Sequence, residues 1–156
     1  MNTTELDLLL RGAEEIIPKD DFLDKLKGKK TNWYENGRKE SESNYKDGKK
    51  DGMWTSWFEN GQIKFENNYK DGKLNGKWTW WYENGQISNE GNYKDGKLDG
   101  KWTEWYENGQ KEQELNYKDG MEHGIRTQWD ENGQIMEERY YKLGELQDWK
   151  ITSIPI

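Results

Sequence analysis

Apolar and polar positions along this chain repeat with a period of 24 residues. In each period a stretch rich in Trp, Tyr and Thr, such as 78–82, precedes an Asn-Gly pair and a more polar stretch, such as 86–93. Aromatic and β-branched residues favour strands, and Asn-Gly supplies the two positive-φ residues of a type I′ hairpin turn. A longer turn, such as 94–100, leads to the next period. Each period therefore predicts one β-hairpin.

Three positions are identical in all five periods and are expected to form the structural core of the repeats. They are the tryptophans Trp33, Trp57, Trp81, Trp105 and Trp129, the tyrosines Tyr45, Tyr69, Tyr93, Tyr117 and Tyr141, and the turn glycines Gly37, Gly61, Gly85, Gly109 and Gly133. Such units stack on their sequence neighbours. The predicted fold is mainly β: a single-layer solenoid or extended meander of about ten strands, preceded by a short two-helix cap.

The expected register divides the aromatic residues between the two faces of the sheet. A two-residue loop at Asn60-Gly61 would pair Trp57 with Lys64 and Phe58 with Ile63. Side chains alternate along a strand, so one face would carry Trp54, Phe58, Ile63, Phe65 and Tyr69, with Trp57 on the other. The invariant Trp57 column is expected to pack the repeats together. The variable face is the candidate binding surface, with Trp54, Phe58, Trp78, Tyr82, Trp102 and Tyr106.

Three segments are expected along the chain. Residues 1–28 carry apolar positions at helical spacing, from Leu6 to Ile17, and then Pro18, which predicts a two-helix cap. Residues 29–148 hold the five hairpin repeats, and 149–156 form a C-terminal tail or cap.

Composition restricts the partners. The chain is 35% charged with a mean hydropathy of −1.42, and its ten Trp, nine Tyr and three Phe must supply most of the buried area. The net charge of −7, without a Lys/Arg cluster, argues against nucleic acid. We expect a cytoplasmic protein without membrane attachment, because the N-terminus lacks a secretion signal and no apolar run is long enough to span a bilayer.

No catalytic group of residues emerges. His123 is the only histidine and occupies a turn position that is Asp51, Asn75 or Asp99 in other repeats. A glutamate precedes the Asn-Gly pair of each of the five predicted hairpin turns, but a catalytic residue is needed once, whereas a fivefold repeat indicates a structural role. We therefore expect no enzyme activity, no cofactor and no metal site. The oligomeric state stays open.

The segment 69–85, with Tyr-Lys-Asp-Gly-Lys-Leu-Asn-Gly, a following Trp and Asn-Gly, resembles the MORN repeat. The Glu-Asn-Gly-Gln turn is most similar to its bacterial variant form, and the resemblance covers 29–148. It implies a β-hairpin scaffold; some relatives are linked to membrane lipids and others to antitoxin or immunity roles. Residues 5–28 resemble the extreme N-terminus of a bacterial tyrosyl-tRNA synthetase, without the nucleotide-binding signatures of that family.

Three functions are consistent with these observations. The first is a protein-interaction scaffold, for example of immunity type, that binds another protein such as a basic toxin-like partner. The second is an aromatic repeat that binds carbohydrate or choline. The third is attachment to membrane lipid, which the negative net charge disfavours.

Overall fold

In the computed structural model, the described residues, 27–151, form one antiparallel sheet and contain no helix. Thirteen strands make up this sheet. They are β1 (Gly28–Trp33), β2 (Lys39–Lys46), β3 (Lys49–Trp57), β4 (Ile63–Lys70), β5 (Lys73–Trp81), β6 (Ile87–Lys94), β7 (Lys97–Leu98), β8 (Gly100–Trp105), β9 (Lys111–Lys118), β10 (Met121–Glu122), β11 (Gly124–Trp129), β12 (Ile135–Lys142) and β13 (Glu145–Ile151).

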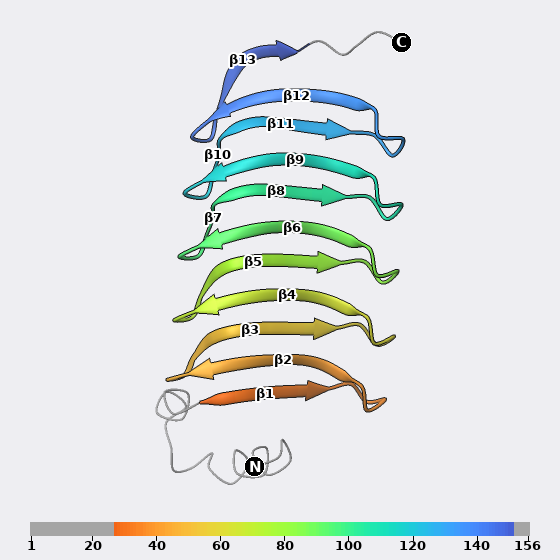
Figure 1. Ribbon diagram of the computed structural model, residues 1–156, viewed down its shortest axis with the longest axis vertical. Coiled ribbons are helices and arrows are strands. Elements are labelled where there is room, and N and C mark those ends of the chain that lie inside the picture. Colours follow the sequence, from red (N-terminus) through yellow and green to blue (C-terminus); the bar gives the residue numbers. More distant parts are fainter. Residues whose placement is uncertain (1–26, 152–156) are drawn as a thin grey trace.

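The strands follow one another across the sheet in chain order, as Figure 1 shows. The short strands β7 and β10 lie just before β8 and β11 in the chain and pair with β6 and β9. Eleven strands therefore form the main path, one more than the sequence predicted. The additional strand is β13, which crosses the expected boundary at residue 148 and pairs with β12.

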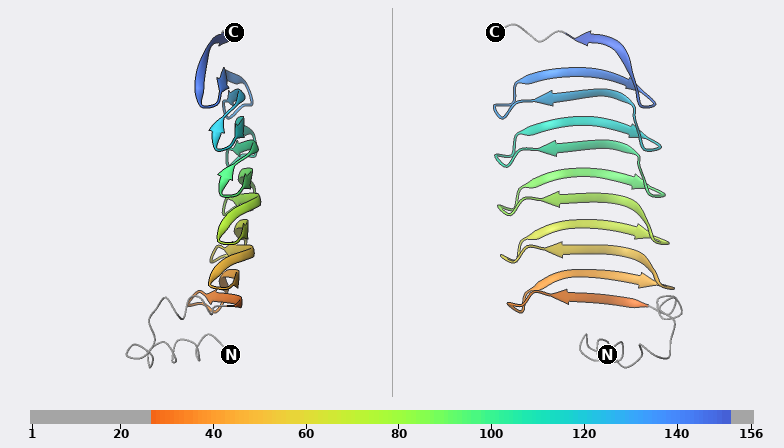
Figure 2. Two further views of the ribbon diagram at one scale, coloured as in Figure 1. Left: turned by 90° about the vertical axis from the view of Figure 1, so that its left-hand side faces the viewer. Right: turned by 180° about the vertical axis from the view of Figure 1, so that it is seen from behind.

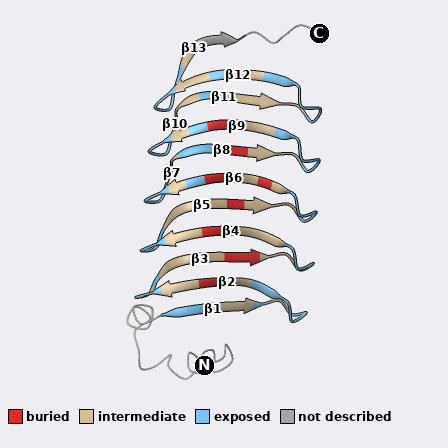
Figure 3. Ribbon diagram, viewed as in Figure 1, coloured by how far each residue is buried: buried red, intermediate tan, exposed pale blue. Residues whose placement is uncertain are grey.

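The sheet is a single layer, which is clearest when it is seen from its edge (Figure 2). Consequently the described residues hold almost no conventional core: Leu115 is the only buried hydrophobic side chain. The other buried residues are small or polar and lie in the middle of the strands (Figure 3). Side chains are buried only by their neighbours within the sheet, which explains how so polar a chain can fold.

The Asp-Gly pairs, rather than the Asn-Gly pairs, form the two-residue hairpin turns. Lys46 pairs directly with Lys49, and both intervening residues have positive φ, at 49° for Asp47 and 74° for Gly48. Positive φ at both central residues is the geometry of a type I′ turn. The prediction of a longer turn at each Asp-Gly pair is therefore wrong.

The Asn-Gly turns are three-residue loops. Gly61 N donates to the Phe58 carbonyl, Phe58 N donates to the Gln62 carbonyl, and of the Asn-Gly pair only the glycine has positive φ. A three-residue loop of this kind ends in a left-handed residue, which Gly provides without strain. The prediction of a two-residue type I′ turn at Asn60-Gly61 is therefore wrong.

A β-bulge follows each Asn-Gly turn and changes the predicted register. Ser56 pairs with Phe65 as expected, but Trp57 pairs with Ile63, so Lys64 is the extra residue. Directly opposed residues share a face, which places Ile63 with Trp57 instead of with Trp54. The same shift recurs in all five units, which we number 1 (29–52), 2 (53–76), 3 (77–100), 4 (101–124) and 5 (125–148).

Hydrogen bonds outside the strand ladders join each unit to the next along the Asn-Gly edge. The Tyr34 hydroxyl donates to the Trp57 carbonyl at 2.7 Å, and Tyr82 and Tyr106 repeat this bond with Trp105 and Trp129. At these three junctions the invariant tryptophan column thus contributes a backbone carbonyl to the stacking of units.

The expected helical cap at 1–28 and the synthetase-like segment 5–28 lie outside the described residues, apart from Lys27 and Gly28. Most of the expected tail, 149–156, lies outside them as well.

We predict that Trp81→Ala destabilises the array more than Trp33→Ala. Trp81 lies in the central unit and is half-buried, whereas Trp33 lies at the end and is 51% exposed. Truncating a well-buried Trp removes roughly 3–5 kcal/mol, so we expect about 2–3 kcal/mol at Trp81 and less than about 1 kcal/mol at Trp33. Urea unfolding of the two variants measures the difference, and equal losses would contradict stacking on both neighbours.

Candidate binding surface

A continuous row of aromatic rings crosses one face of the sheet, and we call it the aromatic strip. Its members are Trp54, Phe65, Trp80, Trp78 and Trp102. Successive ring centroids in this order are 4.9, 5.1, 5.6 and 5.0 Å apart. These separations lie within the range of favourable aromatic pairs. All five side chains are half-buried, so each ring keeps part of its surface open to the surroundings.

The register explains why these rings meet. Phe65 lies directly opposite Trp80, and Trp54 and Trp78 lie on either side of Asn67. Trp78 and Trp80 are two residues apart on β5 and therefore point to the same face. The alternation that places residues i and i+2 together thus builds the strip from three neighbouring units.

Gly91 lets the last two tryptophans of the strip come together. It pairs with Trp78, and a Cβ atom at this position would lie 2.5 Å from Cε3 of Trp102. The Trp102 ring therefore occupies the space above Gly91 and reaches the Trp78 ring. The positions equivalent to Gly91 in the other units are Ser43, Asn67, Leu115 and Arg139, all of which carry side chains.

The strip ends where the terminal units replace its aromatic residues with polar ones. Trp54, Trp78 and Trp102 correspond to Lys30 in unit 1 and to Arg126 in unit 5. Arg126 donates a hydrogen bond to Gln113 Oε1, at 2.8 Å, and forms an ion pair with Glu122, at 3.8 Å. Units 1 and 5 nevertheless join the same sheet. The ring contacts of the strip are therefore not required for a unit to stack.

The chain's own lysine occupies the aromatic pair at the beginning of the strip. Lys50 Nζ lies 3.1 Å from the centroid of the Trp54 ring and 5.0 Å from that of Tyr69. Burial lowers the pKa of Lys50, whereas the ring faces favour its charged form. The equivalent positions in the following units are Leu74, Leu98, Glu122 and Leu146.

Three of the predicted surface residues, Trp54, Trp78 and Trp102, lie in the strip. The other three, Phe58, Tyr82 and Tyr106, lie at the first position of the Asn-Gly turns. There the Tyr82 and Tyr106 hydroxyls bind backbone carbonyls of the next unit, and burial is the main cause that raises the pKa of both phenols. The structure thus divides the six residues between a ring cluster and a turn edge.

Sequence reasoning placed Phe65 on this face but did not include it in the site, and it missed Trp80 and Gly91. Two signals were available. Trp80 is two residues from Trp78, and Gly91 is the one glycine in a column that otherwise carries side chains. Two polar atoms in the same region, Asn67 Oδ1 and Trp80 Nε1, are buried without a hydrogen-bond partner.

The opposite face carries an unbroken row in which threonine and glutamate alternate across ten strands. Each member pairs directly with the next, in the order Thr31, Glu42, Thr55, Glu66, Thr79, Glu90, Thr103, Glu114, Thr127 and Glu138. Thr55, Thr79 and Thr103 are buried. This face is therefore held by polar cross-strand contacts, in contrast to the aromatic strip.

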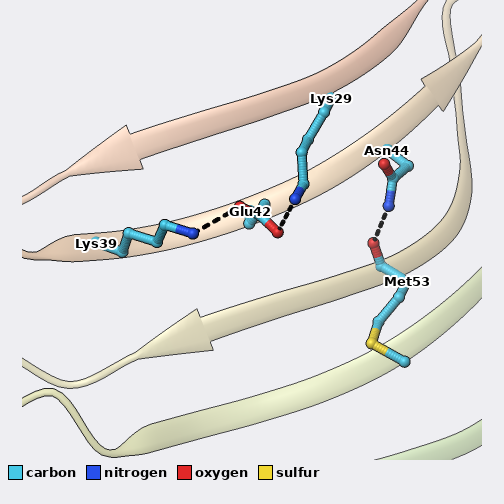
Figure 4. Close-up of polar contacts among 5 residues, drawn as sticks. All are labelled: Lys29, Lys39, Glu42, Asn44 and Met53. Atoms are coloured by element: carbon cyan, nitrogen blue, oxygen red, sulfur yellow. Dashed lines mark hydrogen bonds and ion pairs between the residues drawn. The ribbon is translucent and has the colours of Figure 1, made fainter.

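Lysines neutralise part of this row. The Glu42 carboxylate forms ion pairs with Lys29 Nζ, at 2.5 Å, and with Lys39 Nζ, at 3.0 Å (Figure 4). Lys39 can reach Glu42, three residues away on the same strand, because the bulge at Glu40 restores it to the same face. Beside this group, Asn44 Nδ2 donates to the Met53 carbonyl, where β3 carries extra residues opposite Asn44.

Within residues 27–147, no group of three or more His, Asp or Glu side chains is arranged to hold a metal ion. Among the described residues there is also no helix long and apolar enough to cross a membrane.

The sequence profile of the family described as "MORN repeat variant" matches five consecutive segments of the chain: 26–47, 50–71, 74–95, 98–119 and 122–143. The chain belongs to this family. Repeats of the MORN family are generally non-catalytic modules that interact with proteins or membrane lipids. No curated protein sequence matches the chain significantly, and the likeness of residues 5–28 to a synthetase gains no support.

We predict that Gly91→Ala separates two of the strip's tryptophans in this MORN array. The added methyl group would meet Trp102 at 2.5 Å, so that ring must move away from Trp78. Overpacking of this kind is expected to lower stability by about 1–3 kcal/mol. The circular dichroism of coupled Trp rings should weaken. Asn92→Ala, on the other face of β6, is the matched control; an unchanged Gly91→Ala spectrum would refute the geometry.

We predict that Glu42 contributes stability to the first MORN unit that is lost in acid. Hydrogen bonds from Lys29 and Lys39 hold the pKa of Glu42 below its usual value of 4.5. A lowered folded-state pKa means that the contribution is present above pH 4.5 and disappears as the pH falls through the lower value. Glu42→Gln should therefore lose stability relative to the natural chain at neutral pH, with the difference shrinking below pH 4.5.

Glu66→Gln is the control for this measurement. In its unit the positions of Lys29 and Lys39 are Met53 and Ile63, and no ion pair of Glu66 is found among the described residues. Unfolding midpoints should show the pH-dependent difference for Glu42→Gln alone. The same pH dependence in both variants would contradict the role of the two lysines.

Proposed function

We propose that this chain is a non-catalytic cytoplasmic scaffold that binds another protein through the aromatic strip. The observation that carries this proposal is the distribution of the strip. Its rings are confined to units 2, 3 and 4, although units 1 and 5 stack through the same strand pairing and turn-edge bonds without them. Aromatic residues beyond what the fold requires, exposed together on one surface, favour a binding role.

The turn edge supports the same conclusion. The hydroxyl bond to the next unit, made by Tyr34, Tyr82 and Tyr106, is independent of the strip. Asn60, Asn84 and Asn108 add a second bond, from Nδ2 to a glutamate carbonyl of the following unit. Bonds at the edge of the sheet therefore support stacking in addition to the strip, whose half-exposed rings can also contact a partner.

Charge favours a basic partner. The chain has a net charge of −7, although the strip positions of units 4 and 5 carry both signs, with Glu104 in unit 4 and Arg126 in unit 5. Long-range attraction of this sign accelerates encounter with a cationic protein. An immunity-type role, in which the partner is a basic toxin-like protein, is the most specific form of this proposal.

Two alternatives receive less support from the geometry. A choline-binding array needs open aromatic pairs, but the Trp54–Tyr69 pair already contacts the ammonium of Lys50, and later units carry Leu74 and Leu98 at that position. Attachment to anionic lipid is opposed by the net charge. Binding to neutral glycans or liposomes, without binding to a protein, would favour these alternatives.

We predict that Trp78→Ala weakens binding to the partner. Trp78 contacts Trp80, Tyr93 and Trp102 and links the last ring of the strip to the others. Removing a central aromatic residue from an interface typically costs at least about 2 kcal/mol, or roughly a thirtyfold loss of affinity. Titration calorimetry with the protein captured from the native cell by the immobilised full-length chain measures this loss.

Trp33→Ala is the matched control, because Trp33 is an exposed tryptophan outside the strip. It should bind as tightly as the natural chain. Thermal unfolding of both variants must show that Trp78→Ala remains folded at the temperature of the titration, and Trp102→Ala provides a second strip variant. Equal affinity of Trp33→Ala and both strip variants would show that the partner binds elsewhere.

A further inference from the structure

The chain contains six Asn-Gly pairs, and Asn-Gly is the dipeptide most prone to spontaneous deamidation. Five of the pairs lie in the exposed turns, whereas Asn75-Gly76 lies within β5. In this reaction the glycine backbone nitrogen attacks Cγ of the asparagine. A bond between N and Cγ forms, the bond between Cγ and Nδ2 breaks, and ammonia leaves with the glycine proton. Water then opens the succinimide to aspartate or isoaspartate. The reaction needs no further reactant, so its rate depends on the local sequence and on how freely the side chain moves.

Four of the five pairs have the same local sequence. Asn60, Asn84, Asn108 and Asn132 all lie within Glu-Asn-Gly-Gln, and all four asparagines are exposed. Their glycines also share one backbone bond, from the glycine N to the carbonyl three residues earlier. Neither sequence, exposure nor this bond distinguishes the four sites.

The hydrogen bonds of the asparagine side chains do distinguish them. At the three interior sites Oδ1 accepts the backbone N–H of the following glutamine, at 2.9 Å. At the same sites Nδ2 donates to a glutamate carbonyl of the next unit, at 3.1, 3.0 and 2.9 Å for Asn60, Asn84 and Asn108. Both bonds must break before Cγ can approach the glycine nitrogen.

Asn132 has neither bond among the described residues. Its Oδ1 loses the usual donor because Asp130, which replaces the tyrosine or phenylalanine of other units, accepts the Gln134 N–H at 2.9 Å. Asp130 Oδ1 accepts the backbone N–H of Asn132 as well. The side chain of Asn132 is therefore the free one of the four.

We propose that, among the four Glu-Asn-Gly-Gln turns, Asn132 is the site that deamidates selectively in the folded chain, and that the stacking of repeats protects Asn60, Asn84 and Asn108. Conversion adds one negative charge, and isoaspartate adds a backbone methylene within the three-residue turn. Both changes fall on the hairpin of β11 and β12, in the last unit. Unit 5 thereby carries a chemically labile asparagine, while the equivalent asparagines of units 2, 3 and 4 are protected.

The experiment incubates the full-length folded chain at mildly alkaline pH and follows deamidation by mass spectrometry of tryptic peptides. Peptides 51–64, 102–111 and 127–139 each contain one asparagine, at Asn60, Asn108 and Asn132 respectively. Conversion raises the peptide mass by about 1 Da. We expect Asn132 to convert at least about tenfold faster than the other two, a factor within the net contribution of two hydrogen bonds.

Two comparisons make the result decisive. In urea the three sites should convert at similar rates, because their local sequences are the same. Asp130→Tyr should return the Gln134 N–H to Asn132 Oδ1 and slow conversion at Asn132 in the folded chain. Equal rates in the folded chain, a faster interior site, or an Asn132 that is as stable folded as Asn60 would each overturn the proposal.

Discussion

The whole structure depends on one constraint: a single-layer sheet can bury a side chain only against its neighbours in the same sheet. No second layer covers either face of the described residues, and Leu115 is the only hydrophobic side chain that is fully enclosed. Stability must therefore come from backbone pairing, from cross-strand side-chain contacts and from bonds between successive units. This constraint explains the exact period, since a shift of one residue would separate every contact from its partner.

Because of this constraint, different parts of the repeat supply different stabilising contacts. The turn edge supplies hydrogen bonds between units, and the Thr–Glu row supplies polar contacts on one face. At the junction of units 2 and 3, Phe58 cannot make the hydroxyl bond that Tyr34 makes at the junction before it, but there Phe65 and Trp80 stack at 5.1 Å. A ring contact of the strip thus adds to stacking where it occurs. The terminal junctions show that it is not a requirement.

Much of this fold could be predicted because the repeat occurs five times in the sequence. The hairpin period, the mainly β class and the contact of Trp54 with Phe65 and Tyr69 follow from spacing and alternation alone. The turn assignments could not be obtained in this way. Asn-Gly and Asp-Gly both favour positive φ, and only the number of residues between the paired strands decides which pair forms the two-residue turn. The bulge at Lys64 followed from that choice and moved Ile63 to the other face.

The candidate site was predicted incompletely for a related reason. Reading columns identifies aromatic residues that share a position, such as Trp54, Trp78 and Trp102, but a surface is built from neighbouring columns. Phe65 and Trp80 complete the strip although they occupy other positions of the repeat, because their strands place them beside Trp54 and Trp78. Trp78 and Trp102 meet only because Gly91 lacks a side chain between them. A glycine can therefore be as important to an aromatic surface as the rings themselves. Since the strip exists in three units and the fold in five, selection for stacking alone does not account for it.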